Sequence, residues 1–402
     1  MSTFNGKIIE ISEISVDRFE KNNENSLVYF LSHCHTDHMR GLPNWSFQTS
    51  LLVRPEVFLY ATPISVKILK HLYPQIESKL IEIEIYNSTL IKIPDKDTHL
   101  TVTALPAGHC PGSVMFLFET VDKTILYTGD YRVSASDLRK YKAFYSLGKV
   151  KRIDKMYLDT TFFNLSYFKF PPRSDSINHM FTVIQEWIKQ SSAHIIKIVP
   201  SATYGSEYLF MEIAKIVGMP IHVNPTTYNL YKCIPEMDKS ITLNSTETQI
   251  HASCGSQFKK ICKENNETLI VRTIKPSTLW WKNKNMDRIQ VERGDYRVCY
   301  SCHASFEEIE QFLLFLKPLE VHPCVVPDHH IEREQMFELL EKVMSSYRSK
   351  SSEENEECKL FRDSKNGTKT PEKNENSELE DVLGSPVNTF KRKRLWLQTE
   401  KD

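Results

Sequence analysis

The sequence has 402 residues, of which 40% are hydrophobic and 25% charged, so it is long enough for two packed domains and a tail. Its 51 basic and 51 acidic residues cancel, which excludes a strong overall attraction to a polyanion and leaves only a local patch for nucleic acid. It contains no apolar run near the ~20 residues that cross a bilayer and no export signal at its start, so neither membrane insertion nor export is expected.

The first part of the chain has the pattern of a strand-rich unit. Short runs of strand-forming residues alternate there with turn-forming residues. These runs predict strands at residues 26–31, 101–106, 114–119, 124–127 and 155–158.

A different pattern begins near residue 174. Apolar residues recur at the spacing of one helical face over residues 177–188, a strand-like run follows at 194–199, and a second helical pattern ends at Gly218. Alternating helices and strands indicate an α/β unit. We therefore expect a second domain to begin near Asp159.

The last part of the chain divides into a helix and a tail. Ser305 and Glu308 have capping-box spacing, and the apolar face that follows them predicts a helix ending before Pro318. After residue 345 the chain is rich in Ser, Glu, Asn and Lys, so residues 346–402 are predicted to be disordered. The basic run at 391–394 is consistent with a nuclear import signal, a weak anion-binding patch or a solvated charge run.

Four potential metal ligands fall within six residues, directly after the first apolar run. They are His33, His35, Asp37 and His38. Imidazole and carboxylate groups suit zinc, and a loop at a strand end can turn alternate side chains towards one point. We therefore expect His33 and His35 to face one metal, and Asp37 with His38 to face a neighbouring one.

Three residues elsewhere extend this group. His109 and Asp130 each follow a predicted strand, within Gly-His-Cys-Pro-Gly-Ser and Thr-Gly-Asp-Tyr-Arg. Each alone would be an ordinary turn residue, but together with the first motif they predict a metal site. We expect Asp17 to orient a liganding histidine through its second ring nitrogen.

In order and separation, these motifs resemble those of the metallo-β-lactamase superfamily, and in particular its β-CASP family of DNA-repair nucleases. The similarity runs from about residue 17 to 323 and also covers 157–162, 202–205, 274–278 and 301–305. It implies an α/β fold, with an αββα metallo-β-lactamase sandwich, an inserted β-CASP α/β domain and a disordered C-terminal tail. The domains it implies are residues 1–155 and 304–345 for the sandwich, 156–303 for the β-CASP domain and 346–402 for the tail.

The resemblance also implies roles for single residues. The ligands it implies for one or two active-site Zn²⁺ ions are His33, His35, Asp37, His38, His109 and Asp130. Asp159 would hold His303 near the scissile phosphate, because an imidazole paired with a carboxylate stays protonated more readily and can donate to a phosphate oxygen. The residues expected to serve catalysis are therefore Asp130, His303, Asp159 and Asp17.

A third β-CASP motif separates the branches of the family. RNA-processing members carry a histidine there, whereas this chain places Val325 or Val326 at that point. That favours DNA as the substrate and leaves a second metal with fewer protein ligands. His322, His329 and His330 lie nearby, so a shift of a few residues would restore a ligand.

Substrate contacts are expected from side chains that can donate to phosphate. These are Lys275, Ser277, Thr278 and Ser301. Thr36 stands where the resemblance predicts a lysine, which would weaken one phosphate contact and shift the balance between exonuclease and endonuclease action.

The nine cysteines are an odd number without paired spacing, a pattern typical of a reducing compartment, so disulfides are not expected. His222, His251, Cys254 and Cys262 are a group of metal-ligand types, and DNA-repair members of the family carry a His-His-Cys-Cys zinc site in the β-CASP domain. Cys254 stands one place later than that pattern predicts, and Cys233 is a competing ligand. The group predicts either a structural zinc or unconnected cysteines and core histidines.

The implied function is a zinc-dependent DNA nuclease, a 5′–3′ exonuclease and structure-specific endonuclease on hairpins and overhangs, in double-strand break repair by non-homologous end joining. The implied partners are DNA ends, the DNA-dependent protein kinase catalytic subunit and end-joining factors, and the implied location is the nucleus. The alternatives are an RNA-processing β-CASP nuclease, a telomere or interstrand-crosslink repair exonuclease, a small-molecule hydrolase and a non-catalytic repair scaffold. A small-molecule hydrolase would leave Asp159 and His303 without a purpose, and a scaffold would be free to lose ligands that this chain keeps.

Overall fold

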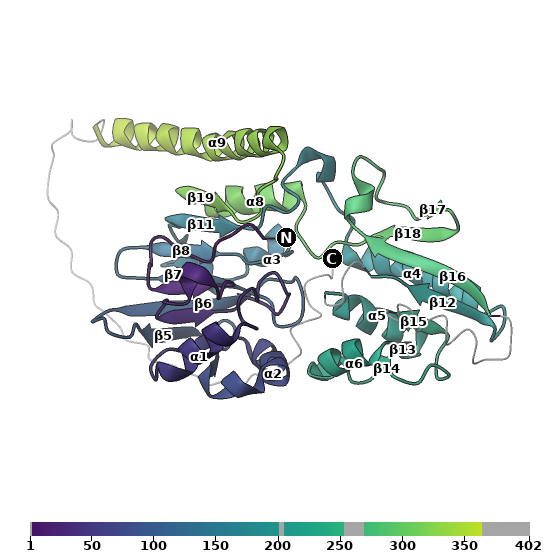
Figure 1. The fold of residues 1–402 in the computed structure, drawn as a ribbon. Helices are drawn as coiled ribbons and strands as arrows, with labels where there is room; N and C mark the ends of the chain where they lie inside the picture. Colours follow the sequence, from purple (N-terminus) through teal and green to yellow (C-terminus); the bar gives the residue numbers. More distant parts are fainter. Residues whose placement is uncertain (1, 201–204, 253–268, 364–402) are drawn as a thin grey trace, which may run out of the picture.

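The computed structural model describes residues 2–200, 205–252 and 269–363, which form two α/β lobes side by side (Figure 1). The first lobe contains two sheets between helices, and the second contains one larger sheet. None of the helices within these residues is both long and apolar enough to cross a lipid bilayer.

The first lobe is built on two sheets. A parallel sheet has the order β1-β2-β3-β4, with β1 at Ile14–Val16, β2 at Val28–Phe30, β3 at Leu59–Ala61 and β4 at Leu80–Glu82. A mixed sheet has the order β19-β11-β8-β7-β6-β5, with β5 at Ser88–Lys92, β6 at His99–Pro106, β7 at Val114–Glu119, β8 at Thr124–Tyr127, β11 at Lys155–Leu158 and β19 at Glu320–Pro323. A small hairpin pairs β9 at Tyr145–Ser146 with β10 at Lys149–Val150.

Strand alternation explains how these layers pack. Because successive side chains of a strand point to opposite faces, Phe116 and Phe118 of β7 pack between the two sheets, whereas Met115 and Leu117 pack under helices. Leu59 belongs to the face of the parallel sheet that other helices cover. The covering helices are α1 at Trp45–Val53, α2 at Pro63–Leu72, α3 at Ala135–Leu138, α8 at Phe306–Leu316 and α9 at His330–Asp363. The predicted αββα sandwich is confirmed.

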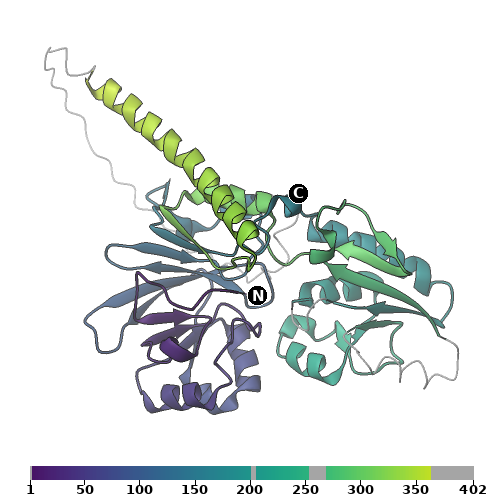
Figure 2. The same ribbon diagram turned by 45° about the horizontal axis from the view of Figure 1, so that its top comes forward.

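The second lobe is a seven-stranded sheet with the order β14-β13-β15-β12-β16-β18-β17, in which only the β17–β18 pair is antiparallel (Figure 2). Its strands are β12 at His194–Ile198, β13 at Ile221–His222, β14 at Ile241–Thr242, β15 at Ile250–Ala252, β16 at Ile270–Ser277, β17 at Gln290–Glu292 and β18 at Asp295–Cys299. Its helices are α4 at Arg173–Ile188, α5 at Glu207–Val217 and α6 at Pro225–Tyr231. Apolar residues of α4 and α5 bury the sheet, among them Ile177 and Leu209.

Most of the predicted elements are observed where the sequence places them. Strands β7, β8 and β11 have the predicted bounds. At the start of α8, Ser305 Oγ accepts the Glu308 amide at 3.3 Å and the Glu308 carboxylate accepts the Ser305 amide at 2.7 Å, which confirms the capping box. Because β11 pairs with β8 and β19, the chain leaves the first lobe only after Leu158.

The C-terminal helix differs from the prediction. Residues 346–363, expected to be disordered, continue α9. Tyr347 is buried and donates its hydroxyl to the Pro318 carbonyl at 2.9 Å, and Arg348 donates to the Leu319 carbonyl at 2.8 Å. These contacts fix α9 to the first lobe, and the Glu and Lys residues that follow favour a helix. The run at 391–394 lies outside the described residues.

Candidate metal centre between the two lobes

The predicted ligands lie on loops that leave the carboxyl ends of strands. Residues 33–38 follow β2, His109 lies in the turn after β6, and Asp130 follows β8. Asp159 follows β11, which runs parallel to β8, so both carboxylates emerge at the same edge of the mixed sheet. His303 follows β18 of the second lobe, and the two lobes therefore meet at this point.

Four of these side chains form a compact cluster. The ligand atoms of His33, His35, His109 and Asp130 all lie within 4.8 Å of one another. His35 Nδ1 and His109 Nε2 are 3.0 Å apart, and Asp130 Oδ2 is 3.6 Å from the Nε2 atoms of both His33 and His109. Ring nitrogens and a carboxylate that converge in this way can bind a divalent metal ion.

The protonation states of the cluster suit a metal. Burial holds the pKa of His33 and His109 well below the usual range and lowers the pKa of His35 to about 4. Burial opposes ionisation of Asp130, but His38 and His303 outweigh it and hold the pKa of Asp130 well below its usual range. Neutral imidazoles and an ionised carboxylate are the forms that ligate a metal.

His33 supplies an independent test of this fit. Its Nδ1 lies 3.0 Å from Ser32 Oγ, whereas its buried Nε2 has no hydrogen-bond partner among the described residues. Buried polar atoms in folded proteins nearly always have a partner. The Nε2 atom faces Asp130 within the cluster, so a cation shared by these residues would satisfy it.

A second group of side chains centres on Asp17. Asp17 Oδ2 accepts hydrogen bonds from Ser32 Oγ at 2.5 Å, Tyr127 Oη at 2.7 Å and His38 Nδ1 at 2.8 Å. His38 Nε2 then lies 3.2 Å from Asp130 Oδ1 and 3.9 Å from Asp37 Oδ2. Burial disfavours the imidazolium, but Asp130 and Asp17 raise the pKa of His38 well above its usual range. Asp17 therefore holds the second ring nitrogen of a motif histidine.

Asp159 and His303 form a pair beside the cluster. His303 Nδ1 lies 2.9 Å from Asp159 Oδ2, and His303 Nε2 lies 3.9 Å from Asp130 Oδ2. Asp159 Oδ1 accepts the Thr161 amide at 2.9 Å and its hydroxyl at 2.6 Å. Burial lowers the pKa of His303, but the two carboxylates outweigh it and raise that pKa. Ser301 is buried and donates to the His303 carbonyl at 2.8 Å, so it braces this histidine instead of facing solvent.

The other predicted substrate contacts differ in their surroundings. Thr36 is exposed on the metal-binding loop. Lys275 Nζ pairs with Asp295 at 2.5 Å, and Thr278 donates to a backbone carbonyl at 2.8 Å. Ser277 Oγ is buried without a hydrogen-bond partner in the described part of the chain.

Val325 and the three histidines near the third motif have different surroundings in the structure. The Val325 carbonyl accepts a hydrogen bond from Thr160 Oγ1 at 2.5 Å, so Val325 contacts the residue that follows Asp159. His322 is on β19 and packs its ring against two aromatic rings, whereas His329 and His330 are exposed at the start of α9. None of these three histidines belongs to a potential metal-binding group of the described residues.

The predicted second zinc group is seen only in part. His222 and His251 lie on neighbouring strands β13 and β15, with their Nδ1 atoms 3.1 Å apart. Burial lowers the pKa of both, and that of His251 to about 4. Cys254 and Cys262 lie outside the described residues. Cys233 Sγ donates to the Asn229 carbonyl at 3.6 Å.

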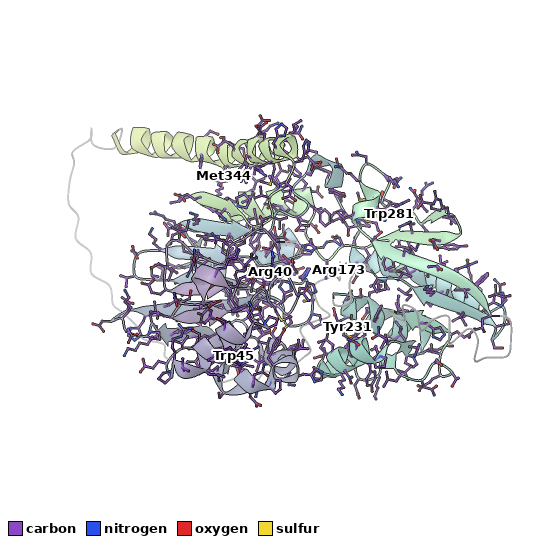
Figure 3. All side chains as sticks on the ribbon, in the orientation of Figure 1. Arg40, Trp45, Arg173, Tyr231, Trp281 and Met344 are labelled. Atoms are coloured by element: carbon purple, nitrogen blue, oxygen red, sulfur yellow. The ribbon has the colours of Figure 1, made fainter. Side chains whose placement is uncertain are left out.

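Arginine side chains join the two lobes next to the cluster. Arg173, at the start of α4, lies between the lobes (Figure 3) and donates to the Gly108 carbonyl at 2.6 Å and to the Ser301 carbonyl at 3.3 Å. Arg132 donates to the same Ser301 carbonyl at 3.0 Å. The turn before His109 and the segment before His303 are thus fixed to each other.

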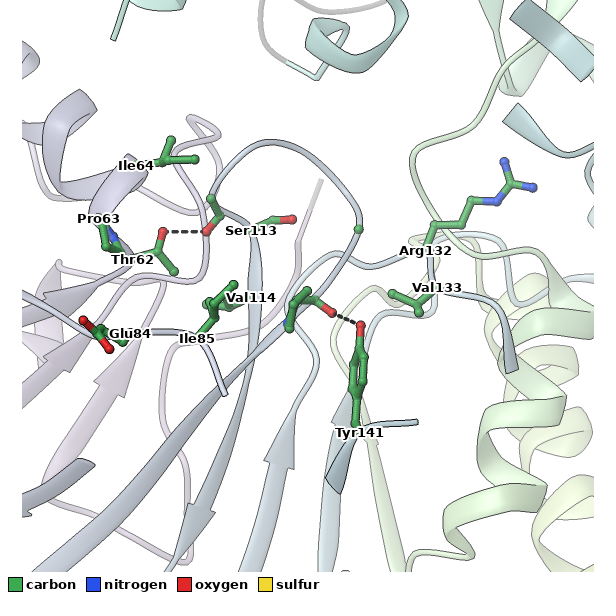
Figure 4. Close-up of a pocket in the computed structure, with 13 residues that line it drawn as sticks. Thr62, Pro63, Ile64, Glu84, Ile85, Ser113, Val114, Arg132, Val133 and Tyr141 are labelled. Carbon is green, nitrogen blue, oxygen red and sulfur yellow. Dashed lines mark hydrogen bonds between the residues drawn. The ribbon is translucent and has the colours of Figure 1, made fainter. Parts of the chain in front are cut away.

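A cavity of about 380 Å³ lies behind the turn that carries His109 (Figure 4). Most of its lining is apolar, including Ile64, Ile85 and Val133. Thr62 Oγ1 donates to the Gly112 carbonyl at 2.7 Å and holds the far end of the turn. None of the predicted metal ligands lines this cavity, so it is separate from the cluster.

We did not predict three residues that support the carboxylates. Ser32 and Tyr127 bind Asp17, and Thr161 binds Asp159. Ser32 and Thr161 are next to predicted site residues, so their hydroxyls were an available signal. Tyr127 is 110 positions away from Asp17, and no local pattern reports such a contact.

Comparison with known proteins gives consistent matches. The family model "DNA repair metallo-beta-lactamase" matches residues 235–329. Protein artemis of Mus musculus is 36% identical over 346 residues, which cover 81% of this chain and 49% of that protein, and Protein artemis of Homo sapiens is 35% identical, with 81% and 50% covered. The 5′ exonuclease Apollo of Gallus gallus is 28% identical, with 81% and 64% covered. This chain therefore spans about half the length of the Artemis proteins that it matches. With about 35% identity over most of its length, the chain is a homologue of the Artemis proteins, and its residues 235–329 match the DNA repair metallo-β-lactamase family model.

Proposed function

We propose that this chain is a zinc-dependent DNA nuclease, a 5′–3′ exonuclease and structure-specific endonuclease that acts on hairpins and overhangs. The observation that carries the proposal is the placement of the Asp159–His303 pair against Asp130, at the edge of the cluster of three histidines. A metal group and a raised-pKa imidazole that face one point suit hydrolysis of a phosphodiester. The relatives named for DNA repair and 5′ exonuclease action supply the substrate class.

The metal residues fit zinc. His33, His35 and His109 with Asp130 form the nitrogen-rich set that zinc prefers, and His38 with Asp37 would face a second ion. We assign the first lobe, through Leu158 and again from residue 304 to residue 363, to the metallo-β-lactamase domain and residues 159–303 to the β-CASP domain. When bound, zinc would supply positive charge to the phosphate and lower the pKa of a water to about 7.

The protein groups then have distinct tasks. Asp130 accepts a hydrogen bond from the attacking water and aligns it with the phosphorus. His303, kept protonated by Asp159, donates its Nε2 proton to the oxygen that leaves as the P–O bond breaks. Asp17 holds His38 in one orientation, because its carboxylate accepts the Nδ1 proton. We also assign a substrate contact to Thr36, which is exposed on the loop that carries His35 and His38.

An apolar residue at the third-motif position favours DNA over RNA. We assign Val325 or Val326 to that position, supported by the hydrogen bond of Val325 to Thr160 and by the ring contacts of His322 and the exposure of His329 and His330. By the same resemblance, we propose non-homologous end joining in the nucleus as the pathway, with the DNA-dependent protein kinase catalytic subunit and end-joining factors as partners. By the resemblance to sibling nucleases of the same family, telomere or crosslink repair is the second candidate.

The first test is cleavage of end-labelled DNA hairpin, 5′ overhang and matched RNA by the purified protein, before and after chelation of its metal. We expect cutting of the hairpin or overhang, loss of cutting after chelation and recovery when Zn²⁺ is returned. Cutting of RNA alone would move the protein to the RNA branch. A protein that carries zinc but cuts none of these substrates would contradict a nuclease that works without a partner.

We also propose a structural zinc held by His222, His251, Cys254 and Cys262. Support comes from the two imidazoles, whose Nδ1 atoms face each other at 3.1 Å. The Cys262→Ser variant is expected to lose one zinc per chain in a metal analysis, because a thiolate ligand would be missing. Cys233→Ser is the matched control and should keep the full complement. Loss of zinc from Cys233→Ser, with none from Cys262→Ser, would exchange the two assignments.

A further inference from the structure

Glu207 is a fully buried carboxylate that the proposed chemistry does not use. It is the first residue of α5, and its side chain is 0% exposed. Its two oxygens accept the Gly205 amide at 2.8 and 3.0 Å, and Tyr231 of α6 also hydrogen-bonds to it. Burial raises the pKa of Glu207 to about 7. Burial of a carboxylate costs free energy unless the group is hydrogen-bonded, and here the Gly205 amide and Tyr231 provide those hydrogen bonds.

Gly205 lies directly against the metal cluster. A Cβ added at Gly205 would be 3.3 Å from His35 Nε2, and its φ of +107° is a conformation that side chains with a Cβ rarely adopt. Only a glycine lets the backbone of the second lobe approach His35 this closely. The hydrogen bond between the Gly205 amide and Glu207 therefore sets the distance between that backbone and His35.

The same glycine also connects to a second ligand. The Gly205 carbonyl accepts a hydrogen bond from Cys302 Sγ at 3.1 Å. The Cys302 carbonyl in turn accepts the Nδ1 proton of His109 at 3.0 Å, which leaves His109 Nε2 to face His35 Nδ1. A continuous set of contacts therefore runs from Glu207 to both histidines.

We infer that Glu207 is a positioning residue that fixes His35 and His109 for metal binding from the opposite lobe. It holds Gly205, whose backbone restricts the position of the His35 ring. Through Cys302, Gly205 also orients the ring of His109. Glu207 hydrogen-bonds to Tyr231, and Tyr231 lies on the side of the second lobe that faces the first (Figure 3). Glu207 is therefore near the junction of the two lobes. This inference rests on the proposed metal centre and adds a residue outside the metallo-β-lactamase lobe to it.

The test is a titration of the full chain with Co²⁺ and Zn²⁺ after metal removal, for wild type and five variants. The metal-binding phase of the titration that disappears in Asp130→Asn is assigned to the active site. Glu207→Ala is expected to weaken that phase by about 10- to 100-fold, the range for loss of an outer partner of a metal ligand. Glu207→Gln keeps an oxygen for the Gly205 amide and should retain most of the affinity. Glu212→Gln, which removes a carboxylate from the same helix, should match wild type.

Gly205→Ala approaches the same contact from the other side. Its methyl group would press on His35 and its backbone would be strained, so it is expected to weaken metal binding even where Glu207→Ala fails to fold. In a nuclease assay, Glu207→Ala should lower kcat and leave KM for DNA unchanged, because the residue lies beneath the site. Restoration by Glu207→Gln separates positioning from a general loss of stability.

Wild-type metal affinity in both Glu207→Ala and Gly205→Ala would overturn the role of Glu207 and leave the proposed nuclease intact. A wild-type protein without any Asp130-dependent metal binding would overturn the proposed function itself. Equal losses in Glu207→Gln and Glu207→Ala would also contradict positioning through the Gly205 hydrogen bond.

Discussion

Replacing Asp130 by asparagine is expected to abolish DNA cleavage, with a fall in rate of roughly 10³-fold or more, as for removal of a preorganised charged group from an active site. The carboxylate faces His33, His38, His109 and His303 together, at 3.2 to 3.9 Å. Asparagine is similar in shape but carries no charge, and its amide would turn N–H groups towards ring nitrogens. Metal affinity should fall with activity, because a ligand is lost.

The measurement is single-turnover cleavage of a labelled hairpin, together with the metal content of the same protein samples. Asp122→Asn is the matched control, since Asp122 is an exposed carboxylate in the turn between β7 and β8. It should leave both quantities unchanged. Asp130→Asn that still cuts at the wild-type rate would sink the assignment of this cluster as the active site.

Replacing His303 by alanine is expected to lower kcat by about 10²- to 10⁴-fold, the range for loss of a general acid. KM for DNA should change little, and any loss of metal should be limited to an ion held by Asp130, Asp159 and His303, because His303 is not part of the cluster of His33, His35, His109 and Asp130. Asp159→Asn should have a smaller effect, since it weakens the support of the imidazolium but leaves the ring in place.

The double variant makes this prediction sharper. If Asp159 acts only through His303, then Asp159→Asn should add almost nothing to His303→Ala, because coupled residues are strongly non-additive. His329→Ala is the control, since His329 is exposed at the start of α9. Additive losses would mean that Asp159 has a separate task, and a large loss in His329→Ala would place the third-motif histidine there after all.

Several elements could be predicted because their signals are local. The runs of strand-forming residues in β7 and β8 and the capping box of α8 are short-range patterns, and they appear at the predicted residues. The extent of α9 could not be predicted in the same way. Residues 346–363 have a polar composition, and the contacts of Tyr347 with the Pro318 carbonyl and of Arg348 with the Leu319 carbonyl show that the helix is fixed to the fold where they begin.

The candidate site divides similarly. The ligand types at His33, His35, His109 and Asp130 are evident from the sequence, because each follows a predicted strand and histidine and aspartate side chains suit a metal. The supporting hydroxyl of Tyr127 and the contact of Gly205 with His35 were not predictable, since they join segments about one hundred residues or more apart.

The sequence by itself determined the chemistry of this protein: which side chains can hold a metal, which loops carry them, and that a strand-rich unit precedes an α/β unit. Only the tertiary structure decided which atoms of those side chains face one another. It shows that Asp17 binds His38 and not His33, that Val325 hydrogen-bonds to Thr160, and that Glu207 holds the Gly205 amide. The reason is physical, since local propensity sets the elements, whereas the packing of two lobes against each other sets distances between residues that are remote along the chain.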